Sequence, residues 1–260
     1  MVNKFAASYR KPIIAVIVVA VVAASAFIVL GTPTGMEDVR VAIYDGGGIL
    51  ESSKIAVDNL FAWMRARVSH VNETSIRAGA LADYDMLVMP AGGGFGEYLH
   101  SDGMDAICQF VEDGGSYFGI CGSARFATDT GLRLFNGTYS PAVDGYGEFL
   151  MEMNVNRSSS GPDLSDEPES YSIFYWNSGY FSADNMSGII PIVTYPDNDL
   201  PAMIAFKYGL GTVFLSSPHP EFEEGSDRDG VTYFDALGDP DSEWGLLLKV
   251  CLWLTQESES

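Results

Sequence analysis

After residue 38, two patterns of hydrophobic and polar positions alternate along the chain. Short apolar runs, each followed by a polar or glycine-rich turn, occupy residues 39–44, 68–72, 86–89 and 116–120. Segments in which apolar residues recur three and four positions apart, as on the inner face of a helix, occupy residues 53–67, 103–112 and 124–130. Strands that alternate with helices are typical of an open parallel sheet. The sequence therefore predicts an α/β fold, with Ser52 or Ser53 capping its first helix.

The second half of the chain has a different pattern. Residues 132–153 alternate apolar and polar positions between turn signals, which favours antiparallel strands added to the parallel sheet. Residues 157–170 are polar and rich in turn residues, so we expect an exposed loop. Further strands are expected at 189–194, 202–208 and 211–216, before a closing helix at 242–255. Tyr175 and Trp176 are interpreted either as packing residues or as a wall against which a substrate stacks.

The first thirty residues differ from the rest. Residues 12–30 are uncharged and mostly apolar, long enough for a helix to span a bilayer, and a short basic segment precedes them. We therefore predict a cytoplasmic N-terminus at 1–11, a transmembrane anchor at 12–30, a linker at 31–37 and one outward-facing domain at 38–256. A cleaved signal peptide ending at Ala24-Ser25-Ala26 is the alternative.

Charge and cysteine content narrow the possible functions. The 260 residues contain 35 acidic and 14 basic side chains, a net charge of -21, which argues against nucleic acid as a partner. No acidic cluster has the spacing of a metal site and no phosphate-binding loop occurs, so neither a metal nor a cofactor is predicted. Three cysteines do not make a disulfide framework; Cys108 and Cys251 are interpreted as core residues.

The third cysteine, Cys121, follows an apolar strand and is flanked by small residues. Gly119 stands two positions before it and Gly122 directly after it. This pattern is typical of a nucleophile elbow, a sharp strand-to-helix turn that raises a reactive side chain beside the free amides of a helix. The alternative interpretation is a buried structural cysteine.

A possible base lies about a hundred residues later, at the end of another strand. His219 is followed two positions on by Glu221. An imidazole held in one tautomer by a carboxylate can accept a thiol proton, so Cys121, His219 and Glu221 are the predicted catalytic triad. A polar turn after a strand is the alternative.

Two further strand exits are rich in glycine, at 46–48 and 92–94. Ligands of open α/β sheets gather at the carboxyl ends of the strands, so both loops are expected beside Cys121. Gly46 and Gly47 are therefore predicted to contact the substrate.

Together these motifs resemble the class I glutamine amidotransferase-like superfamily, and within it the domain at the N-terminus of some biotin–protein ligases. The motifs that carry the closer resemblance are VAIYDGGG at 41–48, DMLVMPAGG at 85–93 and YWNSG at 175–179. The resemblance covers about residues 38–256 and implies a flavodoxin-like open parallel sheet with helices on both faces. It also implies an oxyanion site formed by the amide of Gly122 and one amide from Gly92 or Gly93.

The chain departs from the amidotransferase pattern just after the cysteine. Ser123 and Arg125 stand where glutamine-hydrolysing members usually have glycine and glutamine, and Ala91 replaces the first glycine of a Pro-Gly-Gly motif. Arg125 could instead pair with a substrate carboxylate. The sequence thus predicts a membrane-anchored cysteine hydrolase for a small amide or peptide-like substrate. The alternative is a non-catalytic ligand-binding or sensing module.

Overall fold

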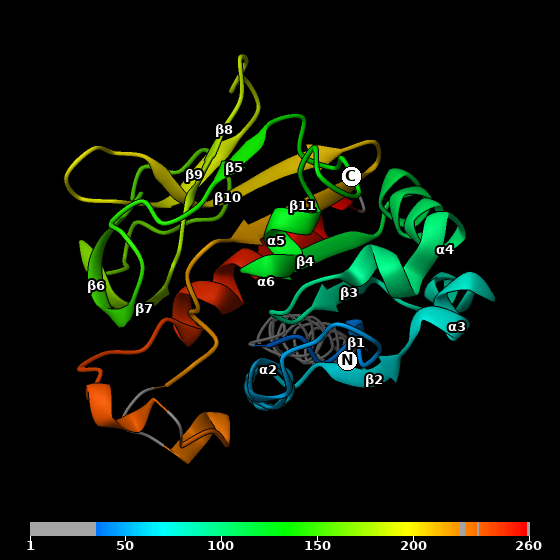
Figure 1. Ribbon diagram of the computed structural model, residues 1–260, viewed down its shortest axis with the longest axis horizontal. Helices are drawn as coiled ribbons and strands as arrows, with labels where there is room; N and C mark the ends of the chain where they lie inside the picture. The colour runs from blue at the N-terminus through cyan, green and yellow to red at the C-terminus, as the bar shows by residue number, and fades with distance from the viewer. Residues whose placement is uncertain (1–34, 224–226, 233, 259–260) are drawn as a thin grey trace, which may run out of the picture. The chain divides into compact units, whose positions relative to one another are not determined.

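The computed structural model describes residues 35–223, 227–232 and 234–258 (Figure 1). The predicted cytoplasmic segment, the anchor at 12–30 and residues 31–34 of the linker lie outside the described residues. Within the described part of the chain, no helix is long and apolar enough to cross a bilayer.

A single mixed sheet forms the centre of the described domain. Its strand order is β2-β1-β3-β4-β11-β10-β9-β6-β7. The strands are β1 (Arg40–Tyr44), β2 (Arg67–Val71), β3 (Met86–Met89), β4 (Ser116–Ile120), β6 (Glu148–Val155), β7 (Ser170–Trp176), β9 (Ile190–Thr194), β10 (Pro201–Tyr208) and β11 (Gly211–Ser216). A separate pair is formed by β5 (Thr138–Ser140) and β8 (Tyr180–Ser182).

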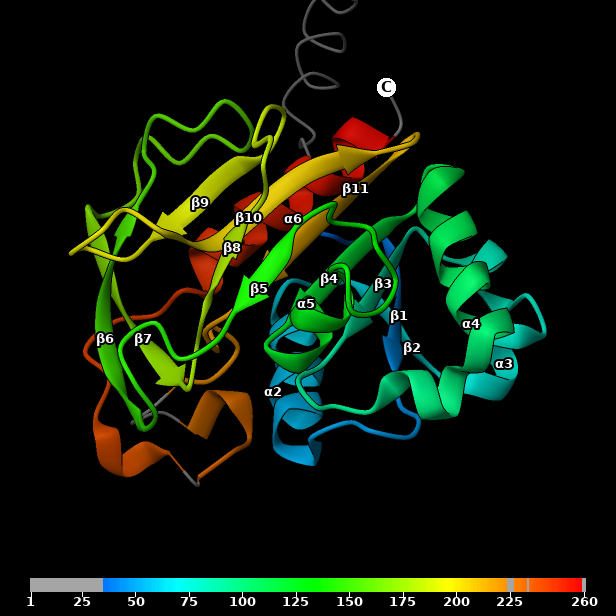
Figure 2. The ribbon, with the colours of Figure 1, turned by 45° about the horizontal axis from the view of Figure 1, so that its top comes forward.

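Two halves of the sheet differ in strand direction. Five strands are parallel: β2, β1, β3, β4 and β11. If they are numbered 1 to 5 as they occur in the chain, their order across the sheet is 2-1-3-4-5, which is that of flavodoxin-like sheets. β10, β9, β6 and β7 continue the sheet through antiparallel pairs, and β6 and β7 lie at the edge far from β2 (Figure 2). The predicted α/β fold with a parallel core and an antiparallel extension is confirmed.

Helices cover both faces of the parallel core, because its strands are apolar on both sides. In β1, Val41 and Ile43 contribute to one core cluster, with α2 (Glu51–Trp63) and α6 (Trp244–Ser258). Ala42 and Tyr44 point the other way, into a cluster with α3 (Glu73–Arg77), α4 (Phe95–Glu112) and α5 (Gly122–Phe126). The continuous apolar runs of the sequence reflect this two-sided burial.

Several local features differ from the sequence prediction. Helix α4 begins at Phe95, earlier than expected, and is broken at His100, whose φ is 55° and ψ −179°. Asn72 caps the unpredicted α3 through a capping box. Neither Ser52 nor Ser53 caps α2, because Leu50 holds that position without a side-chain hydrogen bond. The short 3₁₀ helices are Ala80–Asp83, Asp227–Asp229 and Asp235–Leu237.

Candidate active site

Cys121 lies at the turn between β4 and α5 in a backbone conformation that side chains rarely adopt. Its φ is 52° and its ψ −111°, outside the common regions for a residue with a Cβ. The surrounding structure holds it there: the Cys121 amide donates to Ser216 O at 2.7 Å, and Ser123 Oγ accepts from Ile120 N at 2.8 Å. Ser123 Oγ also lies 2.6 Å from Met89 O on the neighbouring strand. This is the geometry of the predicted nucleophile elbow.

Two glycine loops meet directly beside Cys121. A Cβ on Gly122 would lie 1.7 Å from Gly92 O, and a Cβ on Gly92 would lie 2.1 Å from Gly48 O, so both positions require glycine. The amides of Gly92 and Gly122 donate to no other described residue, whereas the Gly93 amide donates to Gly48 O at 2.8 Å. Of the three predicted oxyanion donors, Gly92 and Gly122 therefore have amides available for a ligand, and Gly93 does not.

His219 and Glu221 follow β11, the strand beside β4. His219 Nδ1 lies 3.0 Å from Glu221 Oε1, and both side chains are fully buried. The imidazole packs among the rings of Phe174, Trp176 and Phe222. Its Nε2 has no hydrogen-bond partner among the described atoms. The Nδ1–carboxylate contact fixes the ring so that Nε2 is left for another partner.

Electrostatics favour a charged imidazole at this position. Burial disfavours the imidazolium, but the negative charges of a Cys121 thiolate and of Glu221 outweigh that cost and raise the pKa of His219 to about 10. Cys121 and His219 line the same cavity, although 98 residues separate them in the sequence. The three predicted catalytic residues are thus brought together.

Sequence reasoning missed a buried serine that contacts the same carboxylate. Ser53 Oγ donates to Glu221 Oε1 at 2.7 Å and accepts from the amide of Ala91 at 2.9 Å. In the sequence, Ser53 was interpreted only as a possible helix cap, because a serine near a helix start is common for that reason. Nothing local indicates a partner 168 residues away.

A cavity of about 490 Å³ opens at this end of the sheet. Its lining residues are Leu50, Ala91, Gly92, Cys121, Gly122, Arg125, Tyr139, Pro141, Tyr146, Trp176, Asn177 and His219. Gly93 lines a neighbouring cavity of about 390 Å³ that shares Gly92, Gly122 and Arg125 with the first. Tyr175, in contrast, is buried and stacks on Phe149, so packing explains it whereas its neighbour Trp176 faces the cavity.

Gly46 and Gly47, the other predicted substrate contacts, are not among the described residues that line this cavity. Their loop packs against its own surroundings: Tyr44 Oη lies 3.2 Å from Gly47 O, and a Cβ on Gly47 would lie 2.0 Å from the ring of Tyr98. These two glycines permit close packing of the loop onto neighbouring helices, and the structure does not bring them to Cys121.

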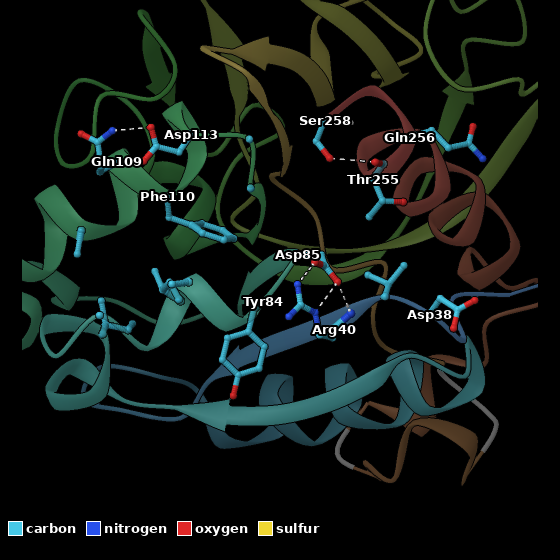
Figure 3. A pocket seen from close by; sticks show the side chains of 18 residues that line it. Asp38, Arg40, Tyr84, Asp85, Gln109, Phe110, Asp113, Thr255, Gln256 and Ser258 are labelled. Carbon is cyan, nitrogen blue, oxygen red and sulfur yellow. Dashed lines mark hydrogen bonds and ion pairs between the residues drawn. The ribbon is translucent and has the colours of Figure 1, made fainter. Parts of the chain in front are cut away.

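A larger cavity, of about 800 Å³, lies at the opposite, amino end of the parallel strands (Figure 3). Arg40 and Asp85 face each other there at 2.6 Å, and Tyr84, Phe110 and Thr255 are among the other lining residues. Its lining residues contain neither cysteine nor histidine. The volume of a cavity therefore does not identify the reactive end of this sheet, whereas the residue types that line it do.

Elsewhere in the described part of the chain, Asp239, Asp241 and Glu243 bring one carboxylate oxygen each within 4.8 Å of the others. Asp241 is exposed, whereas Glu243 is buried. None of the three lines the Cys121 cavity.

The domain has the class I glutamine amidotransferase-like fold. It superposes on a glutamine amidotransferase from Thermotoga maritima with a TM-score of 0.51 and 12% identity, covering 85% of this chain and 90% of the other. Within that class, residues 39–133 match the family described as "Biotin-protein ligase, N terminal". The match includes Cys121 and both free glycine amides but ends before His219.

Curated relatives are distant. A biotin–protein ligase from Schizosaccharomyces pombe is 28% identical over 166 residues, 54% of this chain and only 26% of the ligase. Phosphoribosylformylglycinamidine synthase subunit PurQ from Staphylococcus saprophyticus is 24% identical over 164 residues, 56% of this chain and 73% of that subunit. The chain thus spans about a quarter of the length of the ligase it matches.

Proposed function

We propose that the domain is a cysteine-dependent amide hydrolase in which Cys121 is the nucleophile, His219 the general base and acid, and Glu221 the residue that orients the imidazole. The observation that carries the proposal is the strained backbone of Cys121 beside a histidine whose Nδ1 is held 3.0 Å from a buried carboxylate. Strain of this kind persists at functional sites because the surrounding structure enforces it.

The proposed reaction has two steps. The Cys121 thiolate attacks the substrate carbonyl, an S–C bond forms, and the oxyanion accepts hydrogen bonds from the amides of Gly92 and Gly122. Collapse breaks the C–N bond as the imidazolium of His219 gives its proton to the leaving amine. Water, deprotonated by His219, then hydrolyses the thioester and restores the thiol.

The cavity supports a small amide or peptide-like substrate. Arg125 is exposed at its edge, and no described residue forms an ion pair or hydrogen bond with its side chain. Trp176 and the largely exposed Tyr146 supply aromatic surface nearby. A substrate that carries a carboxylate and a flat or apolar group would satisfy both. Arg125 stands where glutamine-hydrolysing amidotransferases usually have glutamine, so free glutamine is not the proposed substrate.

The test is the rate of alkylation of Cys121 by iodoacetamide as a function of pH. In the full-length chain, Cys108 and Cys251 are first replaced by alanine, because only one thiol should report. Burial raises the pKa of both of these thiols, with Asp105 adding to the effect at Cys108, so the two replacements remove thiols that react weakly at neutral pH.

We expect alkylation to reach half its maximal rate at a pH well below the pKa of a free thiol. His219→Ala should move that midpoint to higher pH. The same midpoint in the parent and in His219→Ala would refute the hydrolase. It would favour the alternative function, a ligand-binding or sensing module on the same scaffold. Replacement of the glycine and glutamine of the amidotransferase pattern by Ser123 and Arg125 is the observation that favours this alternative.

We also propose that residues 12–30 anchor the protein in the cell membrane, with the N-terminus in the cytoplasm and the domain outside. The support is their uncharged, apolar composition behind a basic segment. Protease added to intact cells should degrade the domain and leave a membrane-bound N-terminal fragment. Recovery of the intact domain in the medium would instead indicate a cleaved signal peptide.

A further inference from the structure

The reactive end of the sheet contains a buried hydroxyl, that of Ser53, to which the proposed reaction assigns no role. Ser53 is fully buried in the first turn of α2, a helix that contributes no residue to the proposed triad. Its hydroxyl donates to Glu221 Oε1 at 2.7 Å, the same oxygen that lies 3.0 Å from His219 Nδ1. Its other hydrogen bond is accepted from the amide of Ala91 at 2.9 Å.

These two hydrogen bonds connect the carboxylate of the proposed triad with the loop that carries Gly92. Ala91 directly precedes Gly92, whose amide donates to no described residue, and Ala91 O accepts from Leu50 N at 2.7 Å. The Gly93 amide donates to Gly48 O at 2.8 Å, so residues 48–53 hold this loop at three points. Ser53 contributes the one point that also touches the carboxylate. A hydroxyl has one proton to donate, and here that proton goes to Glu221.

We propose that Ser53 is a positioning residue that fixes Glu221 against His219 and, through Ala91, fixes the Gly92 amide against Cys121. The proposal rests on the proposed hydrolase function. Glu221 Oε2 has no hydrogen-bond partner among the described atoms, so Oε1 alone anchors the carboxylate through His219 and Ser53. Without the hydroxyl, the carboxylate is held from one side only and the Ala91 amide is left unpaired in a buried site.

Two probes separate the two effects. Iodoacetamide alkylation reports how far His219 and Glu221 favour the thiolate. Acylation by p-nitrophenyl acetate, in which the S–C bond forms and p-nitrophenolate leaves, also requires the oxyanion site. Both are measured on the full-length chain with Cys108→Ala and Cys251→Ala, with and without Ser53→Ala. Ser52→Ala is the matched control, since Ser52 is the adjacent serine of the same helix.

We expect Ser53→Ala to raise the pH midpoint of alkylation and to slow acylation about tenfold, more than it slows alkylation, as the loss of a hydrogen bond to a charged group implies. Ser52→Ala should change neither rate. In a Glu221→Gln background, Ser53→Ala should have no further effect on the alkylation midpoint, because its influence on the thiolate passes through the carboxylate.

An unchanged midpoint in Ser53→Ala, or an equal shift in the Glu221→Gln background, would overturn the positioning role while leaving the hydrolase intact, provided that His219→Ala still shifts the parent protein. If His219→Ala has no effect in the parent, the hydrolase proposal itself fails, and the role of Ser53 fails with it. The His219 variant therefore tells the two failures apart.

Discussion

The two ends of the parallel sheet carry cavities of opposite character. At the amino end, about 800 Å³ is lined by groups that satisfy one another, such as Arg40 and Asp85 at 2.6 Å. At the carboxyl end, about 490 Å³ is lined by a strained cysteine and by a histidine whose Nε2 has no well-made hydrogen bond among the described atoms. Of these two cavities, the smaller one is therefore lined by a residue with an unpartnered polar atom, His219 Nε2.

The difference follows from how a parallel sheet ends. Loops at the carboxyl ends place the free amides of helix starts and the residues after strands on one edge, as at Cys121 and His219. At the amino ends, helices arrive with carbonyl groups, and Arg40 is paired with Asp85. The cavity at the carboxyl end is thus distinguished by its strained cysteine and its unpartnered histidine nitrogen, and not by its volume.

Loss of the base should give the largest effect and the clearest contrast between the ends. His219→Ala should reduce acylation of Cys121 by p-nitrophenyl acetate by about 10²- to 10⁴-fold, the usual contribution of a general base. The release of p-nitrophenolate measures it. Asp85→Ala, at the other end, should leave the rate within about twofold; a similar loss in both variants would mean that the effect is on folding.

The next largest effect concerns the glycine loops. Gly122→Ala places a Cβ 1.7 Å from Gly92 O and must separate the two amides proposed to bind the oxyanion, so acylation should fall about a hundredfold. Gly93→Ala is the matched control, because a Cβ there meets nothing within 4 Å and its φ is not left-handed. Near-equal rates for the two variants would refute the assignment of the oxyanion site to Gly92 and Gly122.

Much of this site could be predicted because strand exits are visible in a sequence. The bounds of β3 and β11 were predicted to the residue, and Cys121 and His219 come together because β4 and β11 are neighbours, with Ile120 opposite Ser216. Glycine at a strand exit is less informative. The same residue type allows ligand contact at Gly92 and close packing at Gly47, and only tertiary contacts distinguish them.

Long-range polar partners could not be predicted. A buried serine near a helix start has the same local sequence as a cap, so the contact of Ser53 with Glu221 depends entirely on how α2 packs on the sheet. The available amides have the same limit. Which of Gly92 and Gly93 donates elsewhere depends on the 48–53 segment that lies beside them.

The two ends should also respond oppositely to pH. The pKa of His219 rises from about 6.5 in the unfolded chain to about 10, so its charge interactions stabilise the fold fully below pH 6.5 and less as the pH rises toward 10. Burial of Asp85 is outweighed by hydrogen bonds from Arg40, which lower its pKa; that contribution is present above about pH 4 and is lost as the pH falls.

Urea unfolding across pH measures both contributions. The stability difference between the parent and His219→Gln should shrink toward alkaline pH, and that between the parent and Asp85→Asn should shrink toward acid pH. A His219→Gln difference that stays constant from pH 6 to pH 10 would mean that the imidazole is not paired with the negative groups around it.

The smallest expected effect concerns the substrate. Arg125 has no ion-pair partner among the described residues and lies at the edge of the reactive cavity, whereas Arg40 is paired with Asp85 at the other end. Arg125→Ala should therefore slow acylation by an ester that carries a carboxylate about three- to tenfold, and leave acylation by the neutral p-nitrophenyl acetate unchanged. Arg40→Ala should alter neither rate. Equal slowing of both esters by Arg125→Ala would show that the guanidinium supports the elbow and does not select a charged substrate.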